Sequence, residues 1–366
     1  MAFIEHTGFG AIHPSRWNKL AKMPTQRYCW ARASLETINA RDQERLITFG
    51  DALAPLLIRR KGPRRLAFIG DPIGEPYDVL SDVDTIDGLA ESIVKTGLAL
   101  DFRRIPADAP IIGALQRAYR GRGSVVLTPN GGCPYIKLDE TWCEPERHFS
   151  ASRRSTFRNR RRKAESVGQV TFQIIAPKPS EVRALFNEVV AVEAASWMKA
   201  AGIAMAVSRW RLRFYKRFAR YAAREGILRL CFLRIDGRPV AMEYSVECSG
   251  RLFHHKIAYD EAFEFCSPGT LLRLEAIRYA AERGLQSYEF QGIDQQWTRF
   301  WTKTVRPMVR LKAYPLTARG LWVRSYDTVR VSTRRVGKWT ERLKGKLKKG
   351  MDLAAGGQAG QTPPEK

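Results

Sequence analysis

Three consecutive apolar runs, each the length of one β-strand, constrain the fold of this chain more than any other feature. Asp-Gly separates the first two, and Ser-Gly separates the second from the third. Such pairs are typical of hairpin turns, so we predict an antiparallel meander. The three runs span residues 228–235, 239–246 and 252–259. A helical stretch and a further apolar run at 286–291 follow, and this order predicts a βαβ crossover after the meander.

Helical segments are predicted on both sides of the meander. Residues 180–197 read as one helix, and the spacing of Trp210, Phe214, Phe218 and Tyr221 predicts another that ends before Gly226. After the meander, Ser267-Pro268-Gly269-Thr270 opens a helix that runs to Arg283. A short aromatic helix at 295–302 and a last strand at 309–314 complete the pattern.

The first 150 residues also alternate strand-like and helical stretches, with strands predicted at 52–58, 66–70 and 98–105 and a helix at 87–96. The character of the sequence changes at an arginine-rich, helix-compatible run, which precedes a strand at 170–175. We therefore predict an α/β protein with two halves, each a mixed, largely antiparallel sheet flanked by helices. The predicted division is 1–150, 151–316, and a basic helical extension with a disordered tail at 317–366.

Positive charge is the main feature of the composition. The chain has 62 Lys and Arg against 37 Asp and Glu, a net charge of +25. Residues 153–163 contain seven basic and no acidic residues, and the segment from 331 to the end adds nine basic against three acidic. A field of this sign favours anionic partners such as phosphorylated cofactors, acidic lipids or nucleic acid.

Other features narrow the class of protein. No apolar stretch is long enough to span a bilayer, and the first residues lack the pattern of a signal peptide. The six cysteines form no CxxC pair, so we expect free thiols in the cytoplasm and no metal site.

Several strings along the chain carry a resemblance to a known family. They are the arginine-rich run at 153–163, Tyr28-Cys29-Trp30-Ala31-Arg32, Ala54-Pro55-Leu56, Glu193 with Ser196-Trp197 and Lys199, Gly237-Arg238-Pro239-Val240-Ala241, Ala258-Tyr259-Asp260, Ser267-Pro268-Gly269-Thr270-Leu271-Leu272 and Gly292. These strings resemble the GNAT superfamily of acyltransferases, in particular the acetyltransferase domain of the CelD-type cellulose-biosynthesis family, which is related to the Fem-type aminoacyltransferases. The resemblance covers most of residues 25–315 and implies tandem GNAT-like halves that use acetyl-CoA or a longer acyl-CoA.

The helix that begins at Ser267, Pro268, Gly269 and Thr270 is the predicted cofactor-binding element. A helix N-terminus offers free N–H groups and a positive dipole to the pyrophosphate of acyl-CoA. Gly269 lets the backbone approach the phosphates, and Thr270 adds a hydroxyl. The chain lacks the glycine-rich phosphate loop of ordinary GNAT enzymes, and a plain capped helix remains the alternative.

Acyl transfer also needs a base, an acid and an oxyanion donor. Glu193, Lys256 and Tyr259 are the candidate catalytic residues. Strand alternation predicts that His255 and Tyr259 share one face of their strand, and that Lys256 and Asp260 share the other. Glu243 and Asp294 are further candidates, and the acid remains unassigned because the last helix offers Trp and Phe instead of Tyr.

These expectations define a predicted function and its alternatives. The leading prediction is acyl transfer from acyl-CoA to a glycan or lipid-precursor acceptor of the cell envelope, by a cytoplasmic protein. The basic tail, with Trp339, Leu343 and Leu347, either contacts an anionic membrane at the inner face or merely solubilises the chain. The alternatives are Fem-type transfer from aminoacyl-tRNA, and nucleic-acid binding without catalysis. The last is disfavoured because no RNA-binding signature or helix-turn-helix pattern is present.

Overall fold

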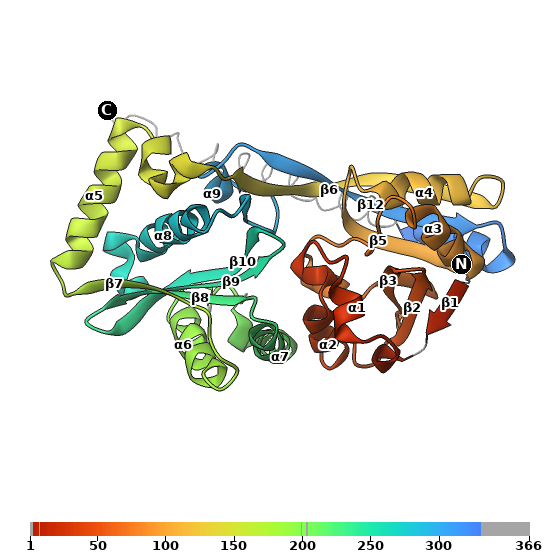
Figure 1. The fold of residues 1–366 in the computed structure, drawn as a ribbon, viewed down its shortest axis with the longest axis horizontal. Helices are drawn as coiled ribbons and strands as arrows, with labels where there is room; N and C mark the ends of the chain where they lie inside the picture. The colour runs from red at the N-terminus through yellow and green to blue at the C-terminus, as the bar shows by residue number, and fades with distance from the viewer. Residues whose placement is uncertain (1–2, 7, 199, 203, 331–366) are drawn as a thin grey trace, which may run out of the picture.

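A twelve-stranded sheet runs through the whole molecule (Figure 1). The structure, a computed structural model, describes residues 3–6, 8–198, 200–202 and 204–330. The predicted tail segments beyond residue 330 lie outside the described residues. The strands are ordered β1-β2-β3-β4-β5-β12-β6-β11-β10-β9-β8-β7 across the sheet.

The same succession of elements occurs twice along the chain. In the first half, β2, β3 and β4 form an antiparallel meander, and α3 crosses over to β5, which lies parallel to β4. In the second half, β8, β9 and β10 form the meander, and α8 crosses over to the parallel strand β11. The strands are β1 Phe3–His6, β2 Gln43–Phe49, β3 Ala52–Ile58, β4 Arg65–Phe68, β5 Ala99–Pro106, β6 Gly123–Lys137, β7 Val170–Ile175, β8 Leu228–Ile235, β9 Arg238–Cys248, β10 Arg251–Tyr259, β11 Ser287–Glu289 and β12 Val305–Pro315.

The two halves are joined by an exchange of strands. Strand β12, the last in sequence, inserts between β5 and β6. The end of β6 reaches in the other direction, and its residues 135–137 pair with β11. Figure 1 shows β6 and β12 bridging the halves along one edge of the molecule. The predicted boundaries at 150 and 316 stay a prediction, but the sheet beside β5 is completed by residues 305–315.

Helices cover both faces of the second-half sheet (Figure 1). Helices α6 and α7 pack on one face, and α5 and α8 pack on the other, so β8 alternates between two cores: Leu230 and Phe232 join one, and Cys231 and Leu233 the other. Burial on both faces explains why these strands read as continuous apolar runs. The α-helices are α1 Pro14–Asn18, α2 Tyr28–Leu35, α3 Ile86–Lys95, α4 Pro110–Ala118, α5 Ala151–Glu165, α6 Val182–Ala194, α7 Arg209–Arg224, α8 Pro268–Glu282 and α9 Gln296–Arg299.

Among the residues that the structure describes, no helix has both the length and the apolar character needed to cross a membrane. The same residues hold no cluster of three His, Cys, Asp or Glu side chains that could bind a metal ion.

Candidate active site

Strands β10 and β11 diverge and form a fork. They pair only over residues 251–253 of β10, and from His254 onward β10 is bonded to β9 alone. Directly after β11, Gln291 and Gly292 adopt left-handed backbone conformations with φ of 56° and 53°. The Arg104 guanidinium of the first half donates to the Gly292 carbonyl. The chain therefore turns away from β10 and leaves one edge of that strand open.

A β-bulge interrupts β10 at the same place. The register with β9 shifts between His254 and Lys256. The His255 ring stacks against Trp30, with ring centroids 5.7 Å apart, and Lys256 Nζ lies 3.4 Å from Glu193 Oε1 on α6. Both side chains thus face the α6–α7 side, whereas Tyr259 faces α8. The predicted alternation along this strand is wrong, because the extra residue of the bulge reverses the alternation beyond it.

Helix α8 begins beside the open edge of β10. Its N-cap Ser267 is left-handed, with φ of 46°, and the Ser267 carbonyl accepts the Thr270 amide at 2.9 Å and the Leu271 amide at 3.3 Å. Pro268 has no amide hydrogen. A Cβ atom on Gly269 would lie 3.3 Å from Tyr259 Cδ1. The first turn therefore offers fewer free N–H donors than predicted, and Gly269 also gives room to the Tyr259 ring.

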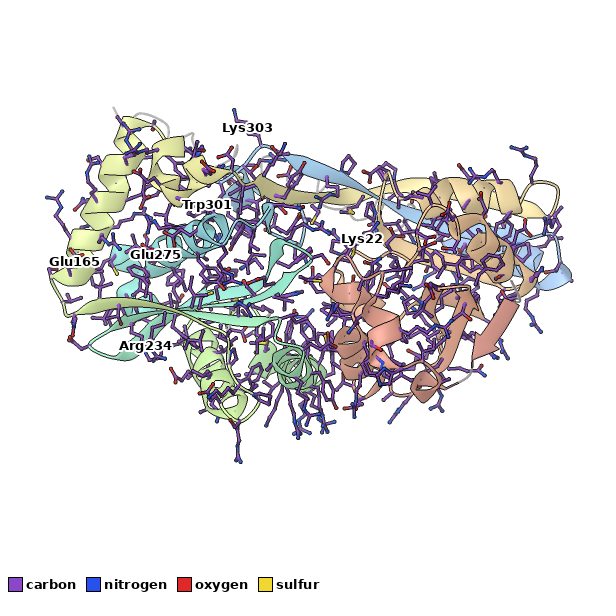
Figure 2. The ribbon with its side chains drawn as sticks, viewed as in Figure 1. Lys22, Glu165, Arg234, Glu275, Trp301 and Lys303 are labelled. Carbon is purple, nitrogen blue, oxygen red and sulfur yellow. The ribbon has the colours of Figure 1, made fainter. Side chains whose placement is uncertain are left out.

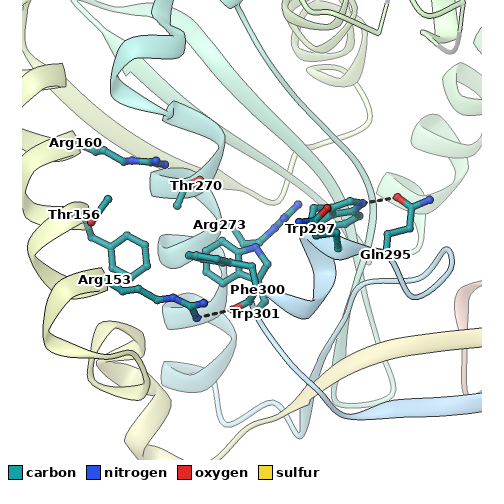
Figure 3. A pocket seen from close by; sticks show the side chains of 11 residues that line it. Arg153, Thr156, Arg160, Thr270, Arg273, Gln295, Trp297, Phe300 and Trp301 are labelled. Atoms are coloured by element: carbon teal, nitrogen blue, oxygen red, sulfur yellow. Dashed lines mark hydrogen bonds between the residues drawn. The ribbon is translucent and has the colours of Figure 1, made fainter.

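A cavity of about 800 Å³ lies between α5, α8 and α9 (Figure 3). We call it the arginine cavity. Thr270, from the predicted cofactor-binding string, lines it together with three arginines. Arg153 Nη1 also donates to the Phe300 carbonyl at 3.4 Å. The lining residues are Arg153, Thr156, Phe157, Arg160, Thr270, Arg273, Gln295, Gln296, Trp297, Phe300 and Trp301.

Arg273 is the most unusual residue of this cavity. The residue is 5% exposed, and its Nε and Nη2 make no hydrogen bond in the described residues, although Nε lies 4.0 Å from Glu243 Oε2. The guanidinium carbon lies 4.8 Å from the ring centroid of Trp297 and 5.5 Å from that of Trp301. Cation–π contacts offset part of the cost of burying this charge, but they leave its N–H donors available. An anionic group in the cavity would complete the site.

A buried polar network lies next to Arg273. Glu243 Oε1 accepts the Tyr288 hydroxyl at 2.8 Å and the Ser245 hydroxyl at 2.7 Å, and Glu243 Oε2 lies 3.5 Å from His254 Nδ1 and 4.0 Å from Arg273 Nε. Burial alone would raise the pKa of Glu243, but His254 and Arg273 outweigh it and lower the pKa. Burial lowers the pKa of His254 despite Glu243. The network therefore holds Glu243 as a carboxylate between the His254 imidazole and the Arg273 guanidinium.

The three candidate catalytic residues lie in two places. Glu193 is fully buried, its Oε2 accepts the Met205 amide at 2.6 Å, and its pKa is raised by burial although Lys256 acts to lower it. Tyr259 packs against the start of α8 on the other side of the sheet, and burial followed by Glu264 raises its pKa. The structure brings Glu193 and Lys256 together and leaves Tyr259 apart from them.

A second cavity, of about 260 Å³, lies between the two halves. We call it the seam cavity. It reaches the fork through Phe253 of β10 and through Glu289 and Gln291. Lys22, labelled in Figure 2 at the junction of the halves, is among its lining residues. These are Lys22, Met23, Thr25, Pro76, Asp78, Pro106, Asp108, Ala109, Pro110, Cys133, Arg251, Phe253, Glu289, Gln291, Arg306 and Met308.

Asp78 is the titratable group of interest in the seam cavity. Burial raises the pKa of its carboxyl to about 7, an effect that Lys22 opposes and Asp108 adds to. The negative charge of Glu289, by contrast, is balanced by Arg306, whose Nη1 donates to Glu289 Oε2 at 2.8 Å. The cavity therefore presents a carboxyl group that changes its charge near neutral pH.

Sequence reasoning missed Arg273, His254 and Asp78. Arg273 carries one local signal, since it lies between Leu271 and Leu274 on a helix whose buried side is otherwise apolar. His254 and Asp78 carry none, because their partners come from distant parts of the chain.

Residues 151–299 match the family model of the acetyltransferase (GNAT) domain. This segment contains α5, the second meander, α8 and α9. The match confirms the predicted enzyme class, an acyltransferase. A comparison with curated protein sequences found no match.

Solved structures share the fold over nearly the whole chain. FemX is 11% identical, with 86% of this chain and 98% of that one covered and a TM-score of 0.59. The C-terminal domain of a putative lysylphosphatidylglycerol synthetase from Agrobacterium fabrum is 12% identical, with 86% and 94% covered and a TM-score of 0.52. A conserved protein of unknown function from Bacteroides thetaiotaomicron is 11% identical, with 81% and 91% covered and a TM-score of 0.52. The predicted fold class is confirmed, and the CelD-type resemblance stays a prediction.

Proposed function

We propose that the protein transfers an acyl group from acetyl-CoA or a longer acyl-CoA to an amine or hydroxyl of a cell-envelope precursor, either a glycan or a lipid. The observation that carries this proposal is the buried guanidinium of Arg273 in the arginine cavity, because its Nε and Nη2 make no hydrogen bond in the described residues. Three arginines and the Thr270 hydroxyl surround a space large enough for a phosphorylated ligand. Charge-assisted hydrogen bonds to phosphate are the interactions that these groups favour.

The open edge of β10 offers a place where the acyl-bearing arm of acyl-CoA can bind. An extended ligand can bond to free backbone groups of a strand edge as an added strand would. The bulge at His254–Lys256 removes one residue from the β9 ladder at the same point. A backbone N–H released there is suited to hold the thioester oxygen as it becomes negative.

In the transfer, the acceptor nitrogen or oxygen bonds to the thioester carbonyl carbon, and the C–S bond breaks to release CoA. The seam cavity, at the other side of the fork, would admit the acceptor. Asp78 is suited to take the acceptor proton, because a base works best when its pKa is near the working pH. Tyr259 would return a proton to the thiolate, and the Glu193–Lys256 pair would hold the bulge in place.

The second candidate, aminoacyl transfer from tRNA, uses the same attack on a different donor. Because the fold is shared with FemX, the experiment below also tests aminoacyl-tRNA as the donor. The similar structure from Agrobacterium fabrum belongs to a putative lysylphosphatidylglycerol synthetase, which supports a lipid as the acceptor.

The decisive experiment combines binding and turnover. Calorimetric titration should show acyl-CoA binding to the parent protein, and a panel of acyl-CoAs with envelope precursors should release free thiol and yield an acylated product by mass spectrometry. Thiol release without tRNA would establish the acyl-CoA donor. A protein that binds no acyl-CoA and transfers only from aminoacyl-tRNA would refute the proposal.

A further inference from the structure

The outer face of α7 carries positive charge and no negative charge. The helix has no acidic residue, and its buried side, which includes Phe214 and Phe218, belongs to the main core. Every exposed position of the helix except Trp210 is a basic residue. We call these residues the α7 stripe: Arg209, Arg213, Lys216, Arg217, Arg220 and Arg224.

Intramolecular ion pairs do not account for this charge. Within the described residues, Arg217 alone among the stripe lies within ion-pair distance of a carboxylate, at 3.6 Å from Glu36. Glu36 already accepts the Tyr221 hydroxyl at 2.7 Å and Arg32 Nε at 3.1 Å. Like charges three and four residues apart on a helix repel each other. The stripe therefore costs folding free energy that an external anionic partner would recover.

The stripe has the dimensions of an extended contact. Sixteen residues of α-helix run for about 24 Å, with side chains on one face about 5–6 Å apart. Two depressions of about 520 Å³ each lie along it. Both are lined by Arg217, Arg220 and Glu36. The Glu36 carboxylate is already bound by Arg32 and by the Tyr221 hydroxyl. Each has room for a phosphate group between arginines.

Apolar side chains are exposed at the start of the stripe. Val207 is 53% exposed and Trp210 is 38% exposed, and the Arg211 guanidinium carbon lies 5.2 Å from the Trp210 ring centroid. Tryptophan beside basic residues is typical of protein surfaces at the membrane–water interface. An aliphatic side chain such as Val207 gains free energy in that interface and none from a nucleic-acid backbone.

We propose that the α7 stripe docks the protein on an anionic lipid surface, with Trp210 and Val207 entering the interface and the basic side chains contacting lipid phosphates. Helix α7 lies on the opposite side of the second-half sheet from α5 and α8 (Figure 1). Docking through α7 therefore leaves the arginine cavity open to a donor from the cytoplasm. The proposal does not depend on which donor the enzyme uses.

The test uses the full chain, so that the tail is the same in every variant. Co-sedimentation with phosphatidylcholine vesicles, with and without phosphatidylglycerol, compares the parent with Arg213→Glu/Arg220→Glu. The matched control is Arg158→Glu/Arg162→Glu, which changes the net charge equally on the exposed side of α5. Each basic residue near an anionic surface contributes about a fivefold gain in partitioning. We therefore expect the α7 variant to lose at least about 30-fold in binding to the anionic vesicles.

The control variant should bind within about threefold of the parent, and Trp210→Ala should weaken binding at high salt, where the charge contribution is screened. Equal losses in the α7 and α5 variants would show a non-specific charge effect and overturn the proposal. It would also be overturned if the α7 variant kept its vesicle binding but lost affinity for tRNA or another nucleic acid. Cooperative thermal unfolding of every variant, with a midpoint no lower than that of the parent, establishes that each one is folded.

Discussion

At the scale of single residues, Arg273 decides how the candidate site is interpreted. Its ion pair with the buried Glu243 is long, at 4.0 Å, and Nε and Nη2 make no hydrogen bond in the described residues. Unsatisfied donors of a buried cation destabilise a fold unless something compensates for them. Aromatic rings surround this guanidinium and stabilise it in part. A residue kept under these conditions is explained better by a ligand than by packing.

We predict that Arg273→Gln weakens CoA binding by about 10- to 100-fold, the loss of one or two charge-assisted hydrogen bonds. The same change should lower the free energy of unfolding by about 3 kcal/mol, because it leaves the buried Glu243 carboxylate without its cationic partner. Calorimetric titration and urea unfolding measure the two effects. Arg158→Gln on the exposed side of α5 is the control. A variant that loses stability yet binds CoA normally would assign Arg273 a structural role.

Gly269 serves either the phosphates or the Tyr259 ring, and a pair of substitutions separates these roles. Gly269→Val should displace Tyr259 and lower the free energy of unfolding by about 1–3 kcal/mol. In the background of Tyr259→Ala, this penalty should largely vanish. If CoA binding remains weak in the folded double variant, Gly269 is required for the approach of the phosphates. If CoA binding returns to that of Tyr259→Ala, the predicted phosphate role of Gly269 is wrong.

Asp78 gives the enzyme a predicted pH dependence. Its pKa of about 7 in the folded protein lies above that of an unfolded aspartate, about 3.9. The folded state therefore binds more protons between these values, and the contribution of Asp78 to stability falls as the pH rises through this window. In the folded protein the Asp78 carboxylate forms around pH 7, so kcat/KM should increase from pH 6 to pH 8 with a midpoint near 7. The charged groups that line the cavity around it are Lys22, Asp108, Arg251, Glu289 and Arg306.

Asp78→Asn should remove this pH dependence, reduce turnover by at least about tenfold, and leave CoA affinity unchanged. It should also stabilise the protein more at pH 8 than at pH 5. Asp84→Asn, an exposed change in the same half, is the control. An unaltered pH–rate profile in Asp78→Asn would exclude Asp78 as the base.

At the scale of elements, local patterns predicted the second half closely. Strands β7 and β8 have the predicted bounds, because Gly168 and the Asp236-Gly237 turn mark their ends. Strand β6 was not predicted, because Pro129, Gly131 and Pro134 make its sequence resemble a loop. Pairing with β12 and β11 keeps it extended, and such pairing has no signature within the strand itself.

The site was predictable only where it depends on one element. The start of α8 follows from Pro268 and Gly269, and the structure places it beside the arginine cavity. The sequence of β10 carries no signal for its bulge, so the sides of the sheet on which His255 and Lys256 lie could not be predicted. From the sequence alone, Arg273 would be interpreted as a solvent-exposed charge, because its burial depends on the packing of α5 and α9. Tertiary packing therefore determined what the sequence left open.

At the scale of the whole molecule, the exchange of β6 and β12 makes each half depend on the other. Without residues 123–137, β11 would lose its antiparallel partner, and without residues 305–315, β5 and β6 would be separated. Exposed backbone edges of this kind favour aggregation. We therefore expect the full chain to unfold in one cooperative transition, despite having two repeated units.

A split chain tests this interdependence. Residues 1–150 and 151–330 expressed separately should each be poorly soluble or lack cooperative unfolding, because each fragment exposes the edges that the other covers. Expressed together, the two fragments should associate through β6 and β12 and recover CoA binding within about tenfold of the intact chain. Circular dichroism, urea unfolding and calorimetric titration provide the readouts. If fragment 151–330 alone unfolded cooperatively and bound CoA as tightly as the intact chain, the second half would be an autonomous domain, and strand exchange would be unnecessary for the site.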